Sequence, residues 1–169
     1  ERAYLAVTRG APRPLVGTVE NRIGRSPYDR KKMAVLDDED EDAGRIAITQ
    51  YKALETFGEL QDNSGLPAAA LIECRLETGR THQIRVHMAH LNSALVGDQL
   101  YNRQRGIKAF GKGDAHELAI NRARAFSRQA LHAASLGFIH PVTGEHVSAS
   151  APLPSDMQDL VVALRKMRD

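Results

Sequence analysis

The stretch Glu77-Thr78-Gly79-Arg80-Thr81-His82-Gln83-Ile84-Arg85-Val86-His87 carries most of the structural information in this sequence of 169 residues. It follows an apolar run, residues 68–76, that is typical of a buried strand. Thr78-Gly79 indicates a turn, and Thr81 is placed to cap a helix that continues to about residue 91. The stretch therefore predicts a strand, a tight turn and a helix in immediate succession.

The predicted helix has an apolar face and a polar start. Ile84, Met88 and Leu91 recur at the spacing of one helical face and predict a stripe that packs on the core. Arg85 lies beside this stripe, so we expect a packed stem and a guanidinium at the rim of the core. Residues 80–83 place several hydrogen-bond donors around a helix N-terminus, where the free backbone N–H groups favour binding of an anion. Solvated arginines and a core histidine would produce the same spacing, so the pattern alone leaves both interpretations open.

The segment Gly79–Met88 resembles the third signature motif of the RluA-type pseudouridine synthases. Other segments resemble the remaining motifs of this family, and they occur in the same order over nearly the whole chain, with the greatest similarity to the branch that modifies large-subunit ribosomal RNA. These segments are Tyr4–Val7 with Gly10, Gly17–Arg25, Asp29–Val35, Ala47–Thr49 with Tyr51, Gly97-Asp98 with Tyr101, Gln129–Ala133, His140–Gly144 and Ala151–Met157.

The resemblance implies a set of site residues. Pseudouridine formation breaks a glycosidic C–N bond, turns the uracil and joins it to the same ribose through carbon, so no cofactor is implied. Tyr4 would stack on the flipped uracil, with its phenolic oxygen near the reacting carbon. Arg85 would pair with the catalytic aspartate and keep it ionised. Leu131 would pack on the other side of the base. The alternative is that Tyr4 is an ordinary strand aromatic and Leu131 an ordinary core residue.

The catalytic aspartate of the family lies in an Arg-Leu-Asp motif before the tyrosine motif. Here three residues precede Tyr4, and Arg75-Leu76-Glu77 belongs to the strand that leads into the third motif. We therefore expect residues 1–169 to be the C-terminal portion of one pseudouridine synthase catalytic domain, with the aspartate upstream and with no activity as an isolated segment. The alternative is a non-catalytic RNA-binding module derived from the family.

The charge pattern is compatible with RNA as the partner. The formal net charge is +2 and the pI is near 8.8. Basic residues fall in three clusters, and we expect at least two of them to contact phosphate. The residues predicted to bind RNA are Arg30, Lys31, Lys32, Arg80, Thr81, His82 and Gln83. We expect ribosomal RNA rather than transfer RNA as substrate, and a monomer in the cytoplasm that has no membrane-spanning segment.

The sequence gives little support for a metal site. The acidic block at residues 37–42 predicts a mobile, solvated loop, and it fails the calcium-loop template at Ala43 and Thr49. Cys74 is the only cysteine, which excludes an internal disulfide and a cysteine zinc site, and we expect it to be buried.

The order of elements predicts an α+β fold with a largely antiparallel mixed sheet flanked by helices and loops. We expect strands at residues 4–8, 46–57 and 68–77, an extended arm at 16–24, and a hairpin made of 131–139 and 146–150. Residues 103–115 are predicted to form a loop, and Ser155 is predicted to cap a final helix over 156–167.

The chain departs from the family pattern at three places. Ser93-Ala94 replaces a His-Pro pair, Asn102 stands where glycine is common, and the acidic block is longer than expected. We expect the first two to border the cleft and to bear on substrate choice.

Overall fold

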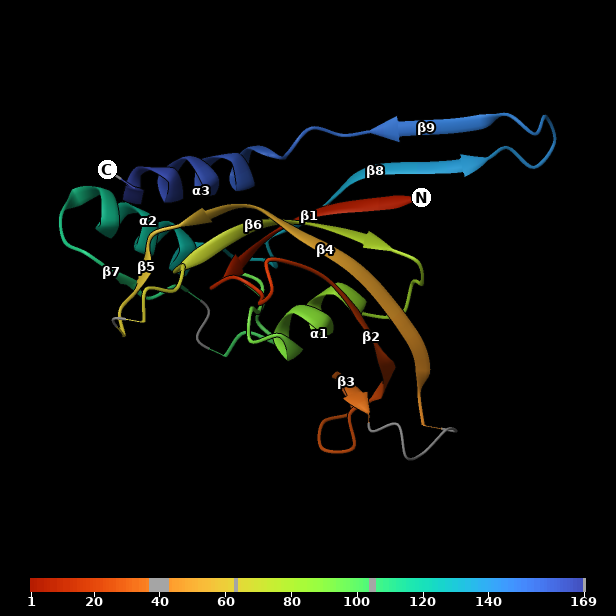
Figure 1. Cartoon of the computed structure of the whole chain (residues 1–169), viewed down its shortest axis with the longest axis horizontal. Coiled ribbons are helices and arrows are strands. Elements are labelled where there is room, and N and C mark those ends of the chain that lie inside the picture. Colours follow the sequence, from red (N-terminus) through yellow and green to blue (C-terminus); the bar gives the residue numbers. More distant parts are fainter. Residues whose placement is uncertain (37–42, 63, 104–105, 169) are drawn as a thin grey trace.

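A computed structural model describes residues 1–36, 43–62, 64–103 and 106–168 (Figure 1). Seven strands form one sheet in the order β3-β2-β4-β6-β1-β8-β9, and β5 pairs with β7 in a small second sheet. The strands are β1 (Arg2–Arg9), β2 (Val16–Arg25), β3 (Met33–Leu36), β4 (Arg45–Phe57), β5 (Glu59–Leu60), β6 (Ala69–Leu76), β7 (Ala109–Phe110), β8 (Leu131–Ile139) and β9 (His146–Ser150). The helices are α1 (Gln83–His90), α2 (Asp114–Ala125) and α3 (Ser155–Arg165), and a 3₁₀ turn, Lys166–Arg168, follows α3.

The predicted α+β class is confirmed. Every pair of neighbouring strands described in the two sheets is antiparallel. The predicted strands, the extended arm and the hairpin formed by β8 and β9 are all present with small shifts at their ends. In Figure 1 this hairpin projects away from the body of the molecule.

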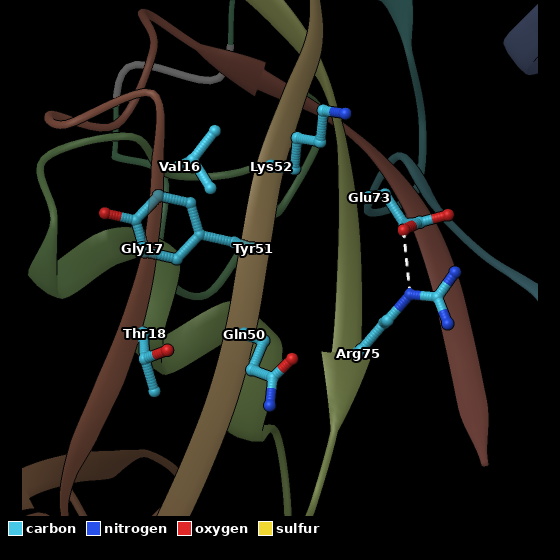
Figure 2. A pocket seen from close by; sticks show the side chains of 8 residues that line it. All are labelled: Val16, Gly17, Thr18, Gln50, Tyr51, Lys52, Glu73 and Arg75. Atoms are coloured by element: carbon cyan, nitrogen blue, oxygen red, sulfur yellow. Dashed lines mark hydrogen bonds and ion pairs between the residues drawn. The ribbon is translucent and has the colours of Figure 1, made fainter.

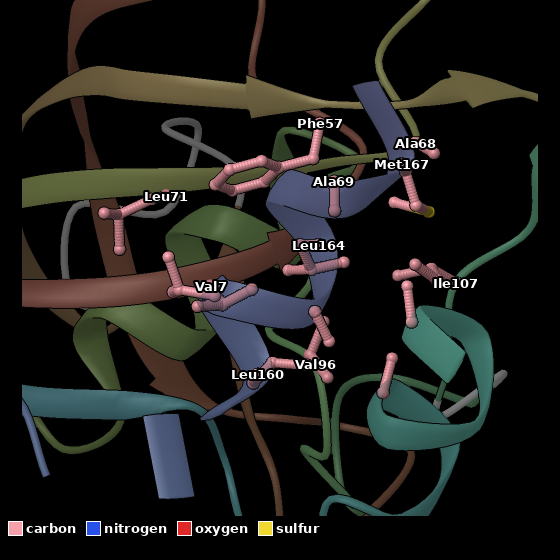
Figure 3. Close-up of a cluster of buried hydrophobic side chains, with 14 of the residues drawn as sticks. Val7, Phe57, Ala68, Ala69, Leu71, Val96, Ile107, Leu160, Leu164 and Met167 are labelled. Atoms are coloured by element: carbon pink, nitrogen blue, oxygen red, sulfur yellow. The ribbon is translucent and has the colours of Figure 1, made fainter. Parts of the chain in front are cut away.

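Alternation along β1 divides the core into two layers, because successive side chains of a strand point to opposite faces. Val7 joins Leu71 and Phe57 in a cluster that α2 and α3 cover, and Figure 3 shows Leu160 and Leu164 of α3 in this cluster. The neighbouring Ala6 belongs to a second cluster, on the opposite face, that contains Ile84 and Met88 of α1. The helix that follows the predicted turn therefore packs on one face of the sheet, and the C-terminal helix on the other.

One helix was not predicted. Residues 103–115, expected to form a loop, contain β7 and the first residues of α2. Along α2 the fully buried positions are Ala119 and Ala123, so the face that packs on the core lacks the large apolar side chains that give a recognisable helical stripe. Close approach to α3 needs small residues at this contact, and small residues leave a weak periodic signal.

Both predicted helix caps are wrong. The N-cap position of α1 is His82, not Thr81, and the N-cap position of α3 is Pro154, with Ser155 already inside the helix. Neither helix start has a side-chain capping hydrogen bond.

The burial of Cys74 is confirmed, and burial raises the pKa of its thiol to about 12. The acidic block at 37–42 lies outside the described residues. Among the helices that the structure describes, none is long and apolar enough to span a membrane.

Candidate active site

The start of α1 is held to the sheet by Gln83, which is 3% exposed. Its Nε2 donates to the carbonyl of Ile48 (2.9 Å) and to Oγ1 of Thr49 (3.0 Å). Its Oε1 accepts from Oγ1 of Thr78 (2.8 Å) and from the backbone N–H of Arg80 (2.9 Å). These four bonds use the amide completely within the protein. Gln83 is therefore a structural residue, and the expectation that its side chain binds RNA is corrected.

Arg85 forms a two-bond ion pair with Asp98. Nε donates to Oδ2 at 2.7 Å, and Nη2 donates to Oδ1 at 3.0 Å. The arginine side chain is 14% exposed and the carboxylate is completely buried. The packed stem and rim position predicted for Arg85 are therefore confirmed, but Asp98 was predicted only as a family motif position without a role.

The carboxylate of Asp98 is stabilised in its ionised form by its neighbours. Burial acts to raise its pKa, but hydrogen bonds from Arg85 and from the backbone N–H groups of Tyr101 and Leu100 outweigh burial and lower it. Gly97 precedes it with φ of +74°, and a Cβ there would collide with the carbonyl oxygen of Arg128. Glycine is therefore required at 97.

Tyr101 links three parts of the site. The guanidinium carbon of Arg85 lies 5.0 Å from the centre of its ring, a distance suited to a cation–π interaction. Its hydroxyl accepts from the backbone N–H of Met33 (2.9 Å) and lies 2.9 Å from Nδ1 of His82. His82 reaches this position with a left-handed φ of 57°, which is uncommon for a residue other than glycine. Burial and the charge of Arg85 lower the pKa of His82, so at neutral pH it is an uncharged hydrogen-bonding group.

A buried polar chain continues from Gln83 through the helix. Oγ1 of Thr49, which accepts from Gln83, lies 2.8 Å from Nδ1 of His87. Nε2 of His87 then donates to Oδ1 of Asn21 at 2.9 Å, which assigns the proton of the neutral imidazole to Nε2. Burial lowers the pKa of His87 to about 4. These hydrogen bonds link α1 to β4 and β2. The spacing of residues in the sequence did not predict them.

Tyr4 and Leu131 lie on the face of the sheet that α1 covers. In β1, Tyr4 pairs with Ala133 of β8, and Ala6 pairs with Leu131, so Tyr4 and Leu131 are diagonal neighbours on adjacent strands. Both are partly buried and pack on the cluster that contains Ile84 of α1. The fold therefore gathers the predicted base-packing residues on the side of the sheet that carries the helix of Arg85.

The predicted RNA-binding residues lie on two neighbouring segments. Arg80 and Thr81 line a hollow of about 340 Å³ together with Met33, the residue that follows the basic loop at 26–32. Nε of Arg80 donates to the carbonyl of Ile46 at 2.9 Å. Arg30 and Lys31 are exposed, whereas Lys32 is half-buried and lies 3.9 Å from the carboxylate of Asp29.

Two further hollows differ in their relation to this site. The first, about 450 Å³, is lined in part by Tyr101, Ala94 and Asn102, so two of the positions that depart from the family pattern lie beside the site. The second, about 300 Å³, lies over β2, β4 and β6 (Figure 2). Its walls carry the Glu73–Arg75 ion pair at 2.9 Å, and none of the predicted site residues lines it.

Comparison with known proteins gives a consistent set of relatives. The family model described as RNA pseudouridylate synthase matches residues 1–90. The ribosomal large subunit pseudouridine synthase D of Xanthomonas campestris is 51% identical over 167 residues, which cover 98% of this chain and 44% of that protein. The protein of the same name from Zymomonas mobilis is 43% identical over 157 residues, covering 93% of this chain and 43% of that protein. The chain thus spans less than half the length of these relatives.

A solved structure agrees with this assignment. Human RNA Pseudouridylate Synthase Domain Containing 4 superposes with a TM-score of 0.66 and 26% identity, covering 97% of this chain and 62% of that one. The family match extends over more than half of the chain and includes Tyr4 and Arg85. The chain belongs to the RNA pseudouridylate synthase family.

Proposed function

We propose that this chain is the C-terminal portion of the catalytic domain of an enzyme that converts uridine to pseudouridine in large-subunit ribosomal RNA. The substrate follows from the names of the relatives, which are ribosomal large subunit pseudouridine synthases. The enzyme would act without a cofactor, because the isomerisation needs no redox step and no group donor. We also propose that it is a monomer in the cytoplasm.

The observation that carries the proposal is the geometry of Arg85. Asp98 takes the Nε and Nη2 side of the guanidinium. Among the described residues, no group accepts a hydrogen bond from Nη1. Because a guanidinium presents five N–H donors in a fixed plane, the Nη1 and Nη2 end can receive a second carboxylate while Asp98 stays in place. That is the requirement for an arginine that orients a catalytic aspartate.

The remaining roles follow from position. The ring of Tyr4, on the face of the sheet that α1 covers, would stack on the flipped uracil, and Leu131 on the adjacent strand would pack against the base. Arg80, Thr81 and the basic loop would contact phosphates at the rim. We also propose that residues 1–169 alone are inactive, because none of the three residues before Tyr4 is an aspartate.

The test uses the full-length source protein and an unmodified 23S ribosomal RNA transcript, with pseudouridine measured by mass spectrometry of the digested RNA. We expect Arg85→Lys to fold, to bind RNA nearly normally and to lose turnover, because an ammonium keeps the charge but not the two-sided geometry. Arg85→Ala should lose turnover as well, and it should be less stable because Asp98 is left buried without its partner.

The matched control is Arg80→Ala, which changes an arginine in the turn that precedes α1. It should weaken RNA binding and flatten its salt dependence while leaving the turnover of bound RNA nearly unchanged. The reverse pattern, in which Arg85 governs affinity and Arg80 governs turnover, would refute the assigned roles. A wild-type protein that binds the transcript without modifying it would favour the non-catalytic RNA-binding module.

A further inference from the structure

The loop between β2 and β3 displays a tyrosine that the proposed reaction does not use. Tyr28 is 97% exposed, the highest value for a large hydrophobic side chain among the described residues. An aromatic side chain buries about 150–250 Å² when it packs. A ring that stays in solvent therefore contributes none of the favourable free energy that this burial would give to folding. A partner that covers the ring would gain this free energy on binding.

The loop is a formed structure. The backbone N–H of Ser26 donates to the carbonyl of Lys32 at 3.0 Å and closes its base. Oγ of Ser26 accepts from the backbone N–H groups of Tyr28 (3.3 Å) and Asp29 (3.2 Å). The N–H of Lys32 donates to the carbonyl of Asp29 at 2.9 Å. The backbone that carries Tyr28 is thus held from both sides, so a ligand on its ring meets a platform that is already ordered.

The surroundings of Tyr28 suit a polyanion. Residues 25–32 contain four basic side chains and one acidic side chain. The acidic residue, Asp29, is engaged within the loop by Lys32 at 3.9 Å and by the backbone N–H of Lys31 at 3.0 Å. Arg25, Arg30 and Lys31 are exposed. An aromatic face among exposed cations is the combination that binds single-stranded nucleic acid, because every base has a face to stack and every nucleotide a phosphate.

The loop is also connected to the candidate active site. Met33, the first residue after it, donates its backbone N–H to the hydroxyl of Tyr101, and the ring of Tyr101 lies 5.0 Å from the guanidinium carbon of Arg85. A base held by Tyr28 would therefore keep a defined offset from the reacting uridine.

We propose that Tyr28 is a stacking platform for an unpaired base of the RNA substrate outside the reacting position, with Arg25, Arg30 and Lys31 on the adjoining phosphates. The proposal rests on the proposed function, since it requires an RNA substrate. It adds a preference for RNA with an unpaired base at this offset, because a base inside a duplex has no free face.

The test compares Tyr28→Ala, Tyr28→Phe and Tyr28→Trp in the full-length protein on the 23S ribosomal RNA transcript. We expect Tyr28→Ala to lose about 5- to 140-fold in affinity, the equivalent of one stacked base at 1.4 kcal/mol per tenfold. Phenylalanine and tryptophan should retain binding. The salt dependence should stay unchanged in Tyr28→Ala, whereas Lys31→Ala should reduce the salt slope by about one. Binding to a fully paired RNA duplex should not depend on residue 28.

A second readout reports on the position itself. These 169 residues contain no tryptophan, so the difference in fluorescence between Tyr28→Trp and the wild type reports on residue 28. Stacking by a base should quench that signal when the transcript is added. Phe110→Ala is the matched control, because Phe110 is an exposed aromatic on β7 outside the site, and it should bind like the wild type.

Several outcomes would overturn the proposal. They are normal affinity in Tyr28→Ala, a loss in Tyr28→Phe equal to that in Tyr28→Ala, and tryptophan fluorescence that the transcript leaves unchanged. A wild-type protein that modifies RNA while Tyr28→Ala does so equally well removes this inference and leaves the proposed function intact. A wild-type protein that neither binds nor modifies RNA removes both.

Discussion

Single side chains on α1 divide the work between chemistry and structure. Arg85 faces the rim and keeps one end of its guanidinium available, whereas Gln83 and His87 face inward and have their polar atoms bonded within the protein. On the sheet beneath, Tyr4 is partly buried and packs on the cluster that contains Ile84 of α1.

Tyr4 has two proposed tasks that substitution can separate. Stacking needs an aromatic face, whereas proton transfer needs the phenolic oxygen. In the full-length enzyme we expect Tyr4→Phe to bind RNA nearly normally and to lose turnover by a factor of about 10²–10⁴, the usual contribution of a general base. Tyr4→Ala should lose affinity as well. Near-normal turnover in Tyr4→Phe would make the hydroxyl dispensable, and near-normal behaviour of Tyr4→Ala would leave Tyr4 as a strand aromatic. Steady-state kinetics with a binding assay distinguishes these cases.

His87 makes stability depend on pH. Its pKa is lowered from 6.5 to about 4 in the folded protein, so between these values the unfolded chain binds a proton that the folded chain does not. The free energy of unfolding should therefore fall as the pH decreases through this window, by about 3 kcal/mol at pH 4 from this residue. Urea unfolding of the wild type and of His87→Gln at pH 7, 5.5 and 4 measures the effect. Equal pH slopes for the two proteins would contradict it.

At the scale of elements, the start of α1 has no capping side chain, and buried hydrogen bonds from a side chain of the helix hold it to the sheet. Gln83 bonds to the carbonyl of Ile48 and to Thr49 on β4, and it also holds the turn at Thr78 and Arg80. The turn that presents Arg80 and Thr81 and the helix that presents Arg85 are thus oriented by one buried amide.

This anchoring predicts a contrast between two neighbouring residues. Gln83→Glu replaces a buried N–H donor with an acceptor that faces the carbonyl of Ile48, and we expect it to lower the free energy of unfolding by about 2–4 kcal/mol. Thr81→Ala, at an exposed position with no capping bond, should change it by less than about 0.5 kcal/mol. Chemical denaturation of the full-length variants provides both values. A loss near 1 kcal/mol in Thr81→Ala would instead support a capping role.

On the scale of the whole molecule, the sheet places its two helical layers so that one face carries the site and the other carries structural packing. Three of the carboxylates that could replace the proposed upstream aspartate already have partners. Asp98 is buried against Arg85, Glu73 pairs with Arg75, and Glu77 accepts from Gln50 at 2.6 Å. None of them is presented as a nucleophile.

We therefore expect residues 1–169, produced as an isolated segment, to form no pseudouridine on the 23S ribosomal RNA transcript under conditions in which the full-length protein does. A full-length variant in which the proposed upstream aspartate is replaced by asparagine is the control for loss of the nucleophile alone. Turnover by the isolated segment would show that Glu1, Glu73, Glu77 or Asp98 can act in its place.

Much of the architecture could be derived from the sequence. Apolar runs and turn residues predicted the strands, the hairpin and the helices at α1 and α3, because burial imposes a regular period on each element. The helix α2 was missed since alanines form its buried face. Family resemblance pointed to Tyr4, Arg85 and Leu131, and the fold gathers Tyr4 and Leu131 on the sheet face that carries the helix of Arg85.

The pairing of polar groups depended on tertiary structure. Arg85 and Asp98 are thirteen residues apart, and His87 meets Asn21 across sixty-six residues. Periodicity describes which face of an element is buried, but it carries no information on which donor meets which acceptor once two elements pack. The sequence by itself determined the family, the order of elements and the residue types of the site. Packing of α1 on the sheet decided that Gln83 is structural and that Asp98 holds Arg85.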